Sequence, residues 1–445
     1  MLKLFVLPML FFCLQGMAQT DSVSVAGTSP AHEPLPERHW TLHYQATVIP
    51  QAHPDFSAGY SGDKSLLTHE SPKVSLTTTL YLGRRLWKGA AAYFNPELSG
   101  GSGLSKAQGV AGFPNGETFR IGSSTPRLYL ARLYLEQKFA LGGETAVNKD
   151  DVNTVQTITP LRYISIRAGK FSLSDFFDNN AYSHDPRTQF LNWSLMSAGA
   201  WDYPANTRGY TIGAVTEYHT PLFAARGAIT QVPKEANGPE LDGKISKAFG
   251  TVAEIEKTVP LNQEQNLVIR LAGFYNQARM GNYEEAIHSI LPDVTASRKY
   301  SRTKTGFYLN AEWNRQHGGY FIRLSGNDGK NETWAFTEID RSVSAGGSFD
   351  GSRWNRDQDQ WGLALVANGI SGPHRRYLQS GGYGFIIGDG DLDYRTEWIA
   401  ELYYVVGIKK FPVTISPDYQ FVLHPAYNSQ RGPVHVVGLR FHFAI

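Results

Sequence analysis

Apolar and polar residues alternate with a period of two along about sixteen segments of this chain, and this alternation constrains the fold more than any other feature. In the first segment, Trp40, Leu42 and Tyr44 alternate with Thr41 and His43, which is the pattern of a β-strand with one polar face. Many of the segments have 9 to 11 residues. A tilted strand of that length crosses a bilayer, whereas strands of water-soluble proteins average about 5 or 6 residues.

The predicted strands share this pattern, and we place their number at about sixteen, to within two. They lie near residues 40–48, 73–82, 89–97, 128–139, 162–170, 209–218, 223–231, 247–257, 265–277, 304–315, 319–327, 336–347, 359–369, 394–406, 413–424 and 434–445.

Charged residues gather on one face of these segments. Arg270, Glu312 and Arg323 each lie opposite an apolar row. A Lys or Arg that faces lipid near the bilayer midplane costs about 2 to 4 kcal/mol, so we expect these charges to face a water-filled lumen. A soluble β-sandwich, the alternative, would have inner faces rich in Val, Ile and Leu, whereas the apolar faces here contain many Tyr, Trp and Gly. The pattern favours an all-β, antiparallel transmembrane barrel.

The end of the chain reads as a closing barrel strand. Its apolar face contains Val437, Phe441 and Phe443 and continues to the final residue, Ile445. A terminal aromatic residue is usual in such strands, so Ile445 is a mild departure. Five tryptophans fall near predicted strand ends, where an aromatic girdle is expected at the membrane interface. They are Trp40, Trp87, Trp313, Trp334 and Trp398.

The first 18 residues have the three parts of a Sec signal peptide: a positive charge at Lys3, an apolar run, and small residues up to Ala18. The apolar run has eleven residues, too few for the roughly 20 that span a bilayer as a helix. We therefore predict a signal peptide over 1–18, a flexible segment over 19–38 and a barrel over 39–445. The expected location is the outer membrane of a Gram-negative bacterium.

Composition argues against several other classes of function. The chain has 42 Lys and Arg residues and 40 Asp and Glu residues, so nothing indicates a nucleic-acid partner. Its single cysteine, Cys13, lies in the predicted signal peptide, which leaves no disulfide or cysteine-based metal site. The chain contains neither an HExxH nor a GxSxG motif. We expect no catalysis, no cofactor and no metal.

A long connection between two predicted strands, residues 172–208, combines many aromatic residues with a polar set. Hairpin loops usually have two to five residues, and disordered segments contain few aromatics. Such a connection is expected to bury its aromatics by folding into the lumen, where it would narrow the channel. Carboxylates, amides and guanidinium groups exchange hydrogen bonds with sugar hydroxyls, and aromatic faces stack on sugar rings.

Residues 93–119, YFNPELSGGSGLSKAQGVAGFPNGETF, and 175–210, DFFDNNAYSHDPRTQFLNWSLMSAGAWDYPANTRGY, resemble the carbohydrate-selective porin family of the OprB type. The similarity continues through 369–394, 417–425 and the closing strand, and so covers nearly all of the chain that follows the leader. The resemblance implies a sixteen-stranded outer-membrane barrel, passive diffusion of mono- or oligosaccharides, and a narrowed pore lined by Arg and acidic residues.

The candidate pathway residues come from the long connection and from the polar faces of the strands. Each strand arginine has an alternative role, as one member of a ladder of opposite charges across neighbouring strands. The candidates are Asp175, Asp178, Asn180, His184, Asp185, Arg187, Asn192, Trp193, Trp201, Asp202, Arg208, Arg132, Arg167, Arg270 and Arg323.

Three other functions remain open at this point. The barrel could be a general, non-selective porin, a lipid hydrolase, or an anchor for a receptor or adhesin with binding loops at 232–246, 278–303 and 348–358. Ion conductance would separate an anchor from a porin. The expected partners are sugars as solutes and outer-membrane lipid, and the chain is either a monomer or a homotrimer.

Overall fold

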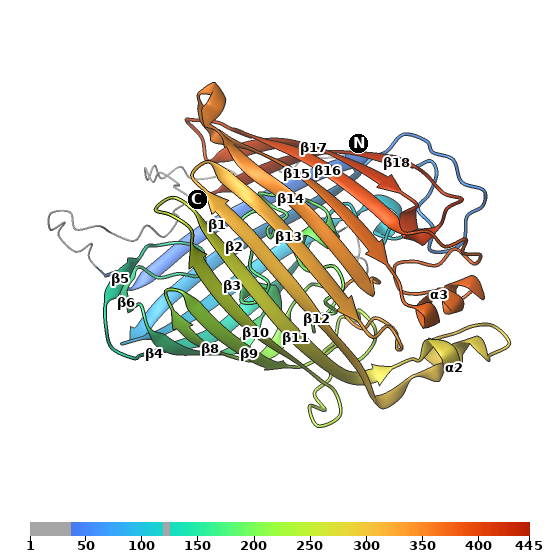
Figure 1. Ribbon diagram of the computed structural model, residues 1–445, viewed down its shortest axis with the longest axis horizontal. Helices are drawn as coiled ribbons and strands as arrows, with labels where there is room; N and C mark the ends of the chain where they lie inside the picture. Colours follow the sequence, from blue (N-terminus) through green and yellow to red (C-terminus); the bar gives the residue numbers. More distant parts are fainter. Residues whose placement is uncertain (1–36, 119–124) are drawn as a thin grey trace.

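Sixteen antiparallel strands close into a single barrel in the computed structural model, which describes residues 37–118 and 125–445 (Figure 1). The predicted signal peptide lies outside the described residues. Each barrel strand pairs with the next barrel strand along the chain, and β1 pairs with β18 to close the barrel. The predicted architecture is confirmed.

The barrel strands are β1 (Trp40–Ala52), β2 (Lys73–Trp87), β3 (Ala90–Gly101), β4 (Arg127–Ala140), β7 (Tyr163–Phe171), β8 (Thr211–Thr220), β9 (Phe223–Thr230), β10 (Phe249–Pro260), β11 (Asn266–Met280), β12 (Lys299–Arg315), β13 (Gly318–Asn327), β14 (Arg341–Gly351), β15 (Arg356–Gly369), β16 (Glu397–Gly407), β17 (Val413–Leu423) and β18 (Val434–Ala444). A separate hairpin consists of β5 (Thr145–Asn148) and β6 (Thr157–Pro160). The helices are α1 (Trp193–Met196), α2 (Tyr283–Ile287) and α3 (Gly372–Gln379), and 3-10 turns occur at Leu104–Lys106, Leu173–Asp175, Thr295–Ser297, Ser352–Trp354 and Pro425–Tyr427.

The two faces of the strands differ as the alternation predicts. On β12, Phe307 is 54% exposed on the outer face, whereas Asn310 on the inner face is fully buried. On β18, Phe441 faces outward and Arg440 inward. Among the described residues no helix is long and apolar enough to span a membrane.

Trp334 is wrongly placed in the predicted girdle. The other four tryptophans of that set are exposed on the barrel, but Trp334 is 1% exposed and donates its indole N–H to the carbonyl of Pro233. The predicted strand 336–347 in fact begins at Arg341, because residues 334–340 belong to a packed loop. In this loop Asp202 accepts the backbone N–H groups of Trp334, Ala335 and Phe336.

The two ends of the barrel differ in the length of their connections. Turns such as 88–89, 221–222 and 316–317 lie at the end that contains both the start of β1 and the end of β18. The long loops lie at the other end, except for residues 141–162 between β4 and β7. In outer-membrane barrels the short turns face the periplasm. The segment 348–358 was expected among the long loops, but it forms the β14–β15 turn at the short-turn end.

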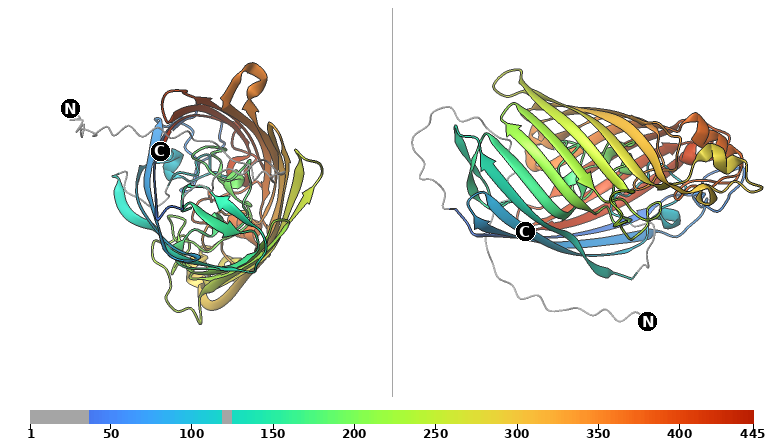
Figure 2. Two further views of the ribbon diagram at one scale, coloured as in Figure 1. Left: turned by 90° about the vertical axis from the view of Figure 1, so that its left-hand side faces the viewer. Right: turned by 90° about the horizontal axis from the view of Figure 1, so that it is seen from below.

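The core of the molecule lies inside the barrel, where the long loops turn inward and pack (Figure 2, left). The loop over residues 172–210, which we call the lumen loop, contributes Phe177, Phe190 and Trp201 to this core. Most aromatic residues of the lumen loop are therefore buried inside the barrel, as predicted.

Candidate functional site

The lumen loop is fastened to the wall formed by β10 to β13 through Asp178. The Asp178 carboxylate accepts hydrogen bonds from Arg323 Nε at 3.0 Å and from Asn310 Nδ2 at 2.6 Å. The Asp178 backbone N–H donates to Glu254 at 2.9 Å. Arg323 also donates to the carbonyls of Ser183 and Leu195. All of these groups are buried, so this contact holds the loop in one position.

A second set of anchors lies on β16. Glu401 accepts the backbone N–H groups of Leu191 at 2.5 Å and of Asn192 at 3.0 Å. Asn192 in turn caps α1 by accepting from Ser194 N–H at 2.9 Å. Carboxylates here take the place of water for loop amides that would otherwise be buried without partners.

Glu397, four residues before Glu401 on the same inner face, holds a different loop. It accepts the backbone N–H groups of Ala111 and Gly112 at 3.0 and 2.8 Å, and that of Ala426 at 2.8 Å. Residues 102–118, which follow β3, therefore pack beside the lumen loop.

The two tryptophans among the candidate pathway residues, Trp193 and Trp201, are covered by other side chains. Trp193 stacks on Phe336 with ring centroids 5.7 Å apart, and Trp201 is fully buried against Tyr203 and Tyr308. The indole rings thus support the loop from inside the core.

Arg187 reaches from the lumen loop to the opposite wall. Its Nη2 lies 2.9 Å from Glu97 of β3, and its Nε lies 3.0 Å from Glu117. Its Nη1 donates to the Tyr81 hydroxyl of β2 at 2.9 Å. Asp185 lies beside Arg187. Burial raises the pKa of Asp185, but the charge and the backbone N–H of Arg187 lower it by more, so the pKa is below its usual value. Arg187 spans the lumen between the loop and β2–β3.

Arg132 and Asp175 form a bidentate pair on the same side of the lumen. The two hydrogen bonds join Arg132 Nε and Nη2 to the Asp175 carboxylate at 2.7 and 2.6 Å. Nearby, Arg208 donates to Ser99 Oγ at 2.9 Å, and its guanidinium lies 4.0 Å from the ring centre of Tyr129.

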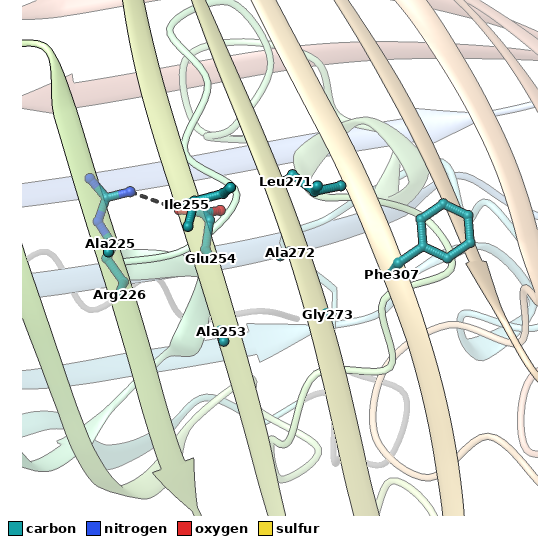
Figure 3. Close-up of a pocket in the computed structure, with 9 residues that line it drawn as sticks. All are labelled: Ala225, Arg226, Ala253, Glu254, Ile255, Leu271, Ala272, Gly273 and Phe307. Carbon is teal, nitrogen blue, oxygen red and sulfur yellow. Dashed lines mark hydrogen bonds and ion pairs between the residues drawn. The ribbon is translucent and has the colours of Figure 1, made fainter.

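Arg167 and Arg270 belong to a continuous ladder of opposite charges on the inner wall from β4 to β12. Neighbouring members lie between 2.7 and 3.4 Å apart, and Figure 3 shows one link, Arg226 with Glu254. We call this set the charge ladder; in order it is Glu136, Arg167, Glu217, Arg226, Glu254 with Glu256, Arg270 and Glu312.

The strand arginines and the polar residues of the lumen loop thus all lie in one lumen, but they belong to separate groups of contacts. Asn180 contacts Asn310 at 2.7 Å, Asp202 accepts loop amides, and burial together with Arg323 lowers the pKa of His184. Several residues that belong to these contacts are not in the predicted set, although their strand parity or the loop composition could have indicated them. They are Glu97, Glu117, Arg226, Glu254, Glu256 and Arg440.

The outer wall behind the ladder has a shallow depression of about 490 Å³ (Figure 3). Its floor is formed by small residues, among them Ala225, Ala253 and Gly273, and the larger Leu271 and Phe307 also line it. It faces the lipid side, because these residues share the outward parity of their strands.

A family model described as "Carbohydrate-selective porin, OprB family" matches residues 64–445. Among solved structures, the chain is similar to OprB of Pseudomonas putida at high pH, with 17% identity, a TM-score of 0.66, and coverage of 92% of this chain and 94% of that one.

A second solved structure is the outer membrane channel DcaP of Acinetobacter baumannii, with 10% identity, a TM-score of 0.50, and coverage of 91% and 97% of the two chains. No curated protein sequence matches. At these identities the structural likeness concerns the fold, and the family match supplies the assignment. The protein is an integral β-barrel of the bacterial outer membrane, and it belongs to the carbohydrate-selective porin family of the OprB type.

Proposed function

We propose that mono- or oligosaccharides diffuse passively through the part of the lumen that lies between the lumen loop and the wall from β1 to β10. The observation that carries this proposal is the loop itself. It crosses the barrel, is held by charged side chains at both walls, and leaves a polar lining beside it.

The residues that we assign to the pathway are those of the polar set whose side chains keep some exposure. Asp175 is 21% and Arg132 14% exposed, and Arg226 and Glu256 of the charge ladder are 11% and 16% exposed. Carboxylate acceptors and guanidinium donors alternate over this surface, which suits the hydroxyl groups of a sugar. Binding must stay weak for the solute to leave.

We assign the fully buried members of the predicted set to a supporting role. Asp178, Asn192 and Asp202 already direct their side chains to loop or wall partners, and Trp201 has no exposed face. In this proposal they shape the pathway without contacting the solute.

Planar-bilayer conductance of the refolded protein, titrated with glucose and with longer glucans, tests the proposal. Open channels that sugars partly block, with altered block in Arg187→Ala, support a sugar porin narrowed by the lumen loop. Arg353→Ala is the matched control, because Arg353 is an exposed arginine in the β14–β15 turn. Stable insertion without conductance would favour an anchored receptor, and conductance without sugar block would favour a non-selective porin.

The proposal includes no catalytic activity, since a channel of this family needs none to pass solutes down a gradient. The proposed function is compatible with two assemblies of the chain, a monomer and a homotrimer. The apolar outer face, including the depression beside Phe307, would contact lipid in a monomer and in part a second copy in a trimer. Native mass spectrometry of the detergent-solubilised protein distinguishes them.

A further inference from the structure

One connection at the short-turn end does not resemble the others. Between β4 and β7, residues 141–162 form the hairpin of β5 and β6, whereas two residues suffice between β2 and β3, between β8 and β9 and between β12 and β13. The ends of β4 and β7 are paired at Ala140 and Tyr163, as the ends of β2 and β3 are paired at Trp87 and Ala90. Closure of the barrel therefore does not require the extra length.

The tip of this hairpin, residues 149–156, turns into the barrel. Asn153 Oδ1 accepts a hydrogen bond at 2.9 Å from Asn95, a fully buried residue on the inner face of β3. Val155 is 3% exposed within the lumen core, and its backbone hydrogen-bonds to the Tyr93 hydroxyl. The tip thus fills space inside the mouth that contains the start of β1 and the end of β18, the mouth that faces the viewer in the left view of Figure 2.

The tip extends across three wall strands. It leaves the wall at β4 and β7, contacts β3 through Asn95, and reaches β1, where Thr41 Oγ1 donates to the carbonyl of Asp151 at 3.4 Å. Because β2 lies between β1 and β3 in the barrel, the tip covers the inner face of this part of the wall.

The tip lies next to the layer of the lumen that Arg187 occupies. Asn95, which holds the tip, and Glu97, which holds Arg187, are two residues apart on the same face of β3. On β1, His43 lies 3.5 Å from Asp150, and Gln45, two residues further, accepts from Arg187 at 3.5 Å. Two residues along a strand span about 7 Å. A solute that passes Arg187 would meet the tip one layer later.

Several of the contacts that hold the tip in place are open to water. Arg38, before β1, pairs with Asp150 at 2.7 Å, and its backbone N–H donates to the carbonyl of Gln156 at 3.0 Å. The Arg38 side chain is 59% exposed, and exposed ion pairs contribute little to stability. Within the tip, Asp151 and Thr154 form a tight turn with Asn153 in the left-handed conformation, which Asn tolerates. The tip is thus locally ordered and combines buried contacts with water-exposed ones.

We propose that residues 149–156 form a second constriction, in series with the lumen loop, that limits solute passage at the short-turn mouth. This inference rests on the proposed function, because it assumes that solutes cross the lumen. It assigns size selection to two successive elements, one on each side of the Arg187 layer.

A replacement of residues 141–162 by Lys-Gly, the dipeptide that joins β2 to β3, tests the proposal in single-channel recordings of the full chain. We expect the conductance to rise roughly 1.5- to 2-fold and longer glucans to pass, because series constrictions add their resistances. An unchanged conductance and an unchanged glucan size limit would overturn the inference, provided that Arg187→Ala alters sugar block in the same preparation. A wild-type protein that does not conduct would instead overturn the proposed function.

Point modification provides a second test that does not depend on folding of the deletion variant. Asp151→Cys places a thiol on the exposed part of the tip, and Ala146→Cys places one on exposed β5 outside the mouth. The chain's own cysteine, Cys13, lies in the predicted signal peptide. Attachment of a sulfonatoethyl thiol reagent should lower the conductance of Asp151→Cys by roughly a third or more and leave Ala146→Cys unchanged. Equal responses of the two variants would contradict a constriction at the tip.

Discussion

Two walls of the same lumen use the same types of residue for different purposes. On β13 to β18, inward side chains such as Arg323, Glu397 and Glu401 bind the backbones of loops. From β4 to β12, the charge ladder pairs carboxylates with guanidinium groups of neighbouring strands. Glu254 and Glu312 lie where the two patterns overlap, because each also accepts a lumen-loop N–H.

Strand parity alone therefore does not reveal the role of a lumen charge. A charge that satisfies buried loop amides is part of the packed core, and its loss should appear first as lost stability. Most ladder charges are buried as well, but Arg226 and Glu256 keep 11% and 16% of their side chains exposed, so the loss of a charge there should also change ion selectivity.

The largest effect is expected for Arg323→Met. The substitution leaves Asp178 buried without its cation and removes the donors to Ser183 and Leu195. Breaking a buried pair costs about 3 to 5 kcal/mol, so the free energy of unfolding should fall by about that amount in urea titrations of the reconstituted protein. Arg353→Met, at an exposed turn, is the control. A loss equal to that of the control would show that Arg323 does not fasten the loop.

Glu397→Gln should have the next largest effect. One carboxylate group accepts three loop N–H groups in the native protein, and an amide retains a single oxygen acceptor. Each buried donor left without a partner costs about 1 to 3 kcal/mol, so we expect a loss of about 2 to 3 kcal/mol and faster hydrogen exchange at Ala111 and Gly112. Unchanged exchange at both amides would contradict the assigned role.

Arg226→Gln probes the other wall. The charge ladder has five carboxylates and three guanidinium groups, a formal charge of −2 that becomes −3 in this variant. We expect the cation-to-anion permeability ratio to rise roughly twofold. The stability loss should be about 1 to 2 kcal/mol, smaller than for Arg323→Met, because each carboxylate that pairs with Arg226 keeps another donor. Reversal potentials under a salt gradient measure the first quantity. A stability loss as large as that of Arg323→Met would erase the distinction between the walls.

The smallest effect concerns pH and the loops outside the membrane. Glu70, before β2, accepts hydrogen bonds from the N–H and Oγ of Ser105 at 2.8 and 2.7 Å and contacts His53 at 3.4 Å. Burial raises the pKa of Glu70, but the hydrogen bonds from His53 and Ser105 lower it more, to about 2. The hydrogen bond to Glu70 raises the pKa of His53 above 6.5.

The signs of these shifts define a pH window. The Glu70 contribution is complete above 4.5 and is lost as pH falls towards 2, whereas the His53 contribution is complete below 6.5 and is lost as pH rises through its raised pKa. Protection of the Ser105 amide from hydrogen exchange should therefore be greatest between pH 4.5 and 6.5. In Glu70→Gln this dependence should disappear, and an identical profile in the variant would rule out the pair as its origin.

Much of the fold could be predicted because each strand must satisfy two different environments. The alternation across Phe307, Asn310 and Trp313 is a local consequence of lipid on one side and a polar lumen on the other. Trp334 was misplaced because a tryptophan beside a strand pattern looks the same in sequence whether it lies in a girdle or a packed loop. The hairpin of β5 and β6 was not predicted, because its strands have only four residues each.

The candidate site was predictable in kind but not in arrangement. A ladder of opposite charges was the alternative considered for Arg167 and Arg270, and both belong to one. The partners of Arg187 come from β3 and from residue 117, far from it in the sequence. Nothing local to Arg187 specifies them.

The sequence by itself determined the barrel, its strand number to within two and the face that most strand residues present, because period two and membrane-spanning length are local properties. The family resemblance added the expectation of a narrowed sugar channel. Tertiary structure decided which charges fasten the lumen loop, which form the charge ladder, and that the tip at 149–156 enters the short-turn mouth. These outcomes depend on which strands become neighbours when the barrel closes, and closure joins residues far apart in the chain.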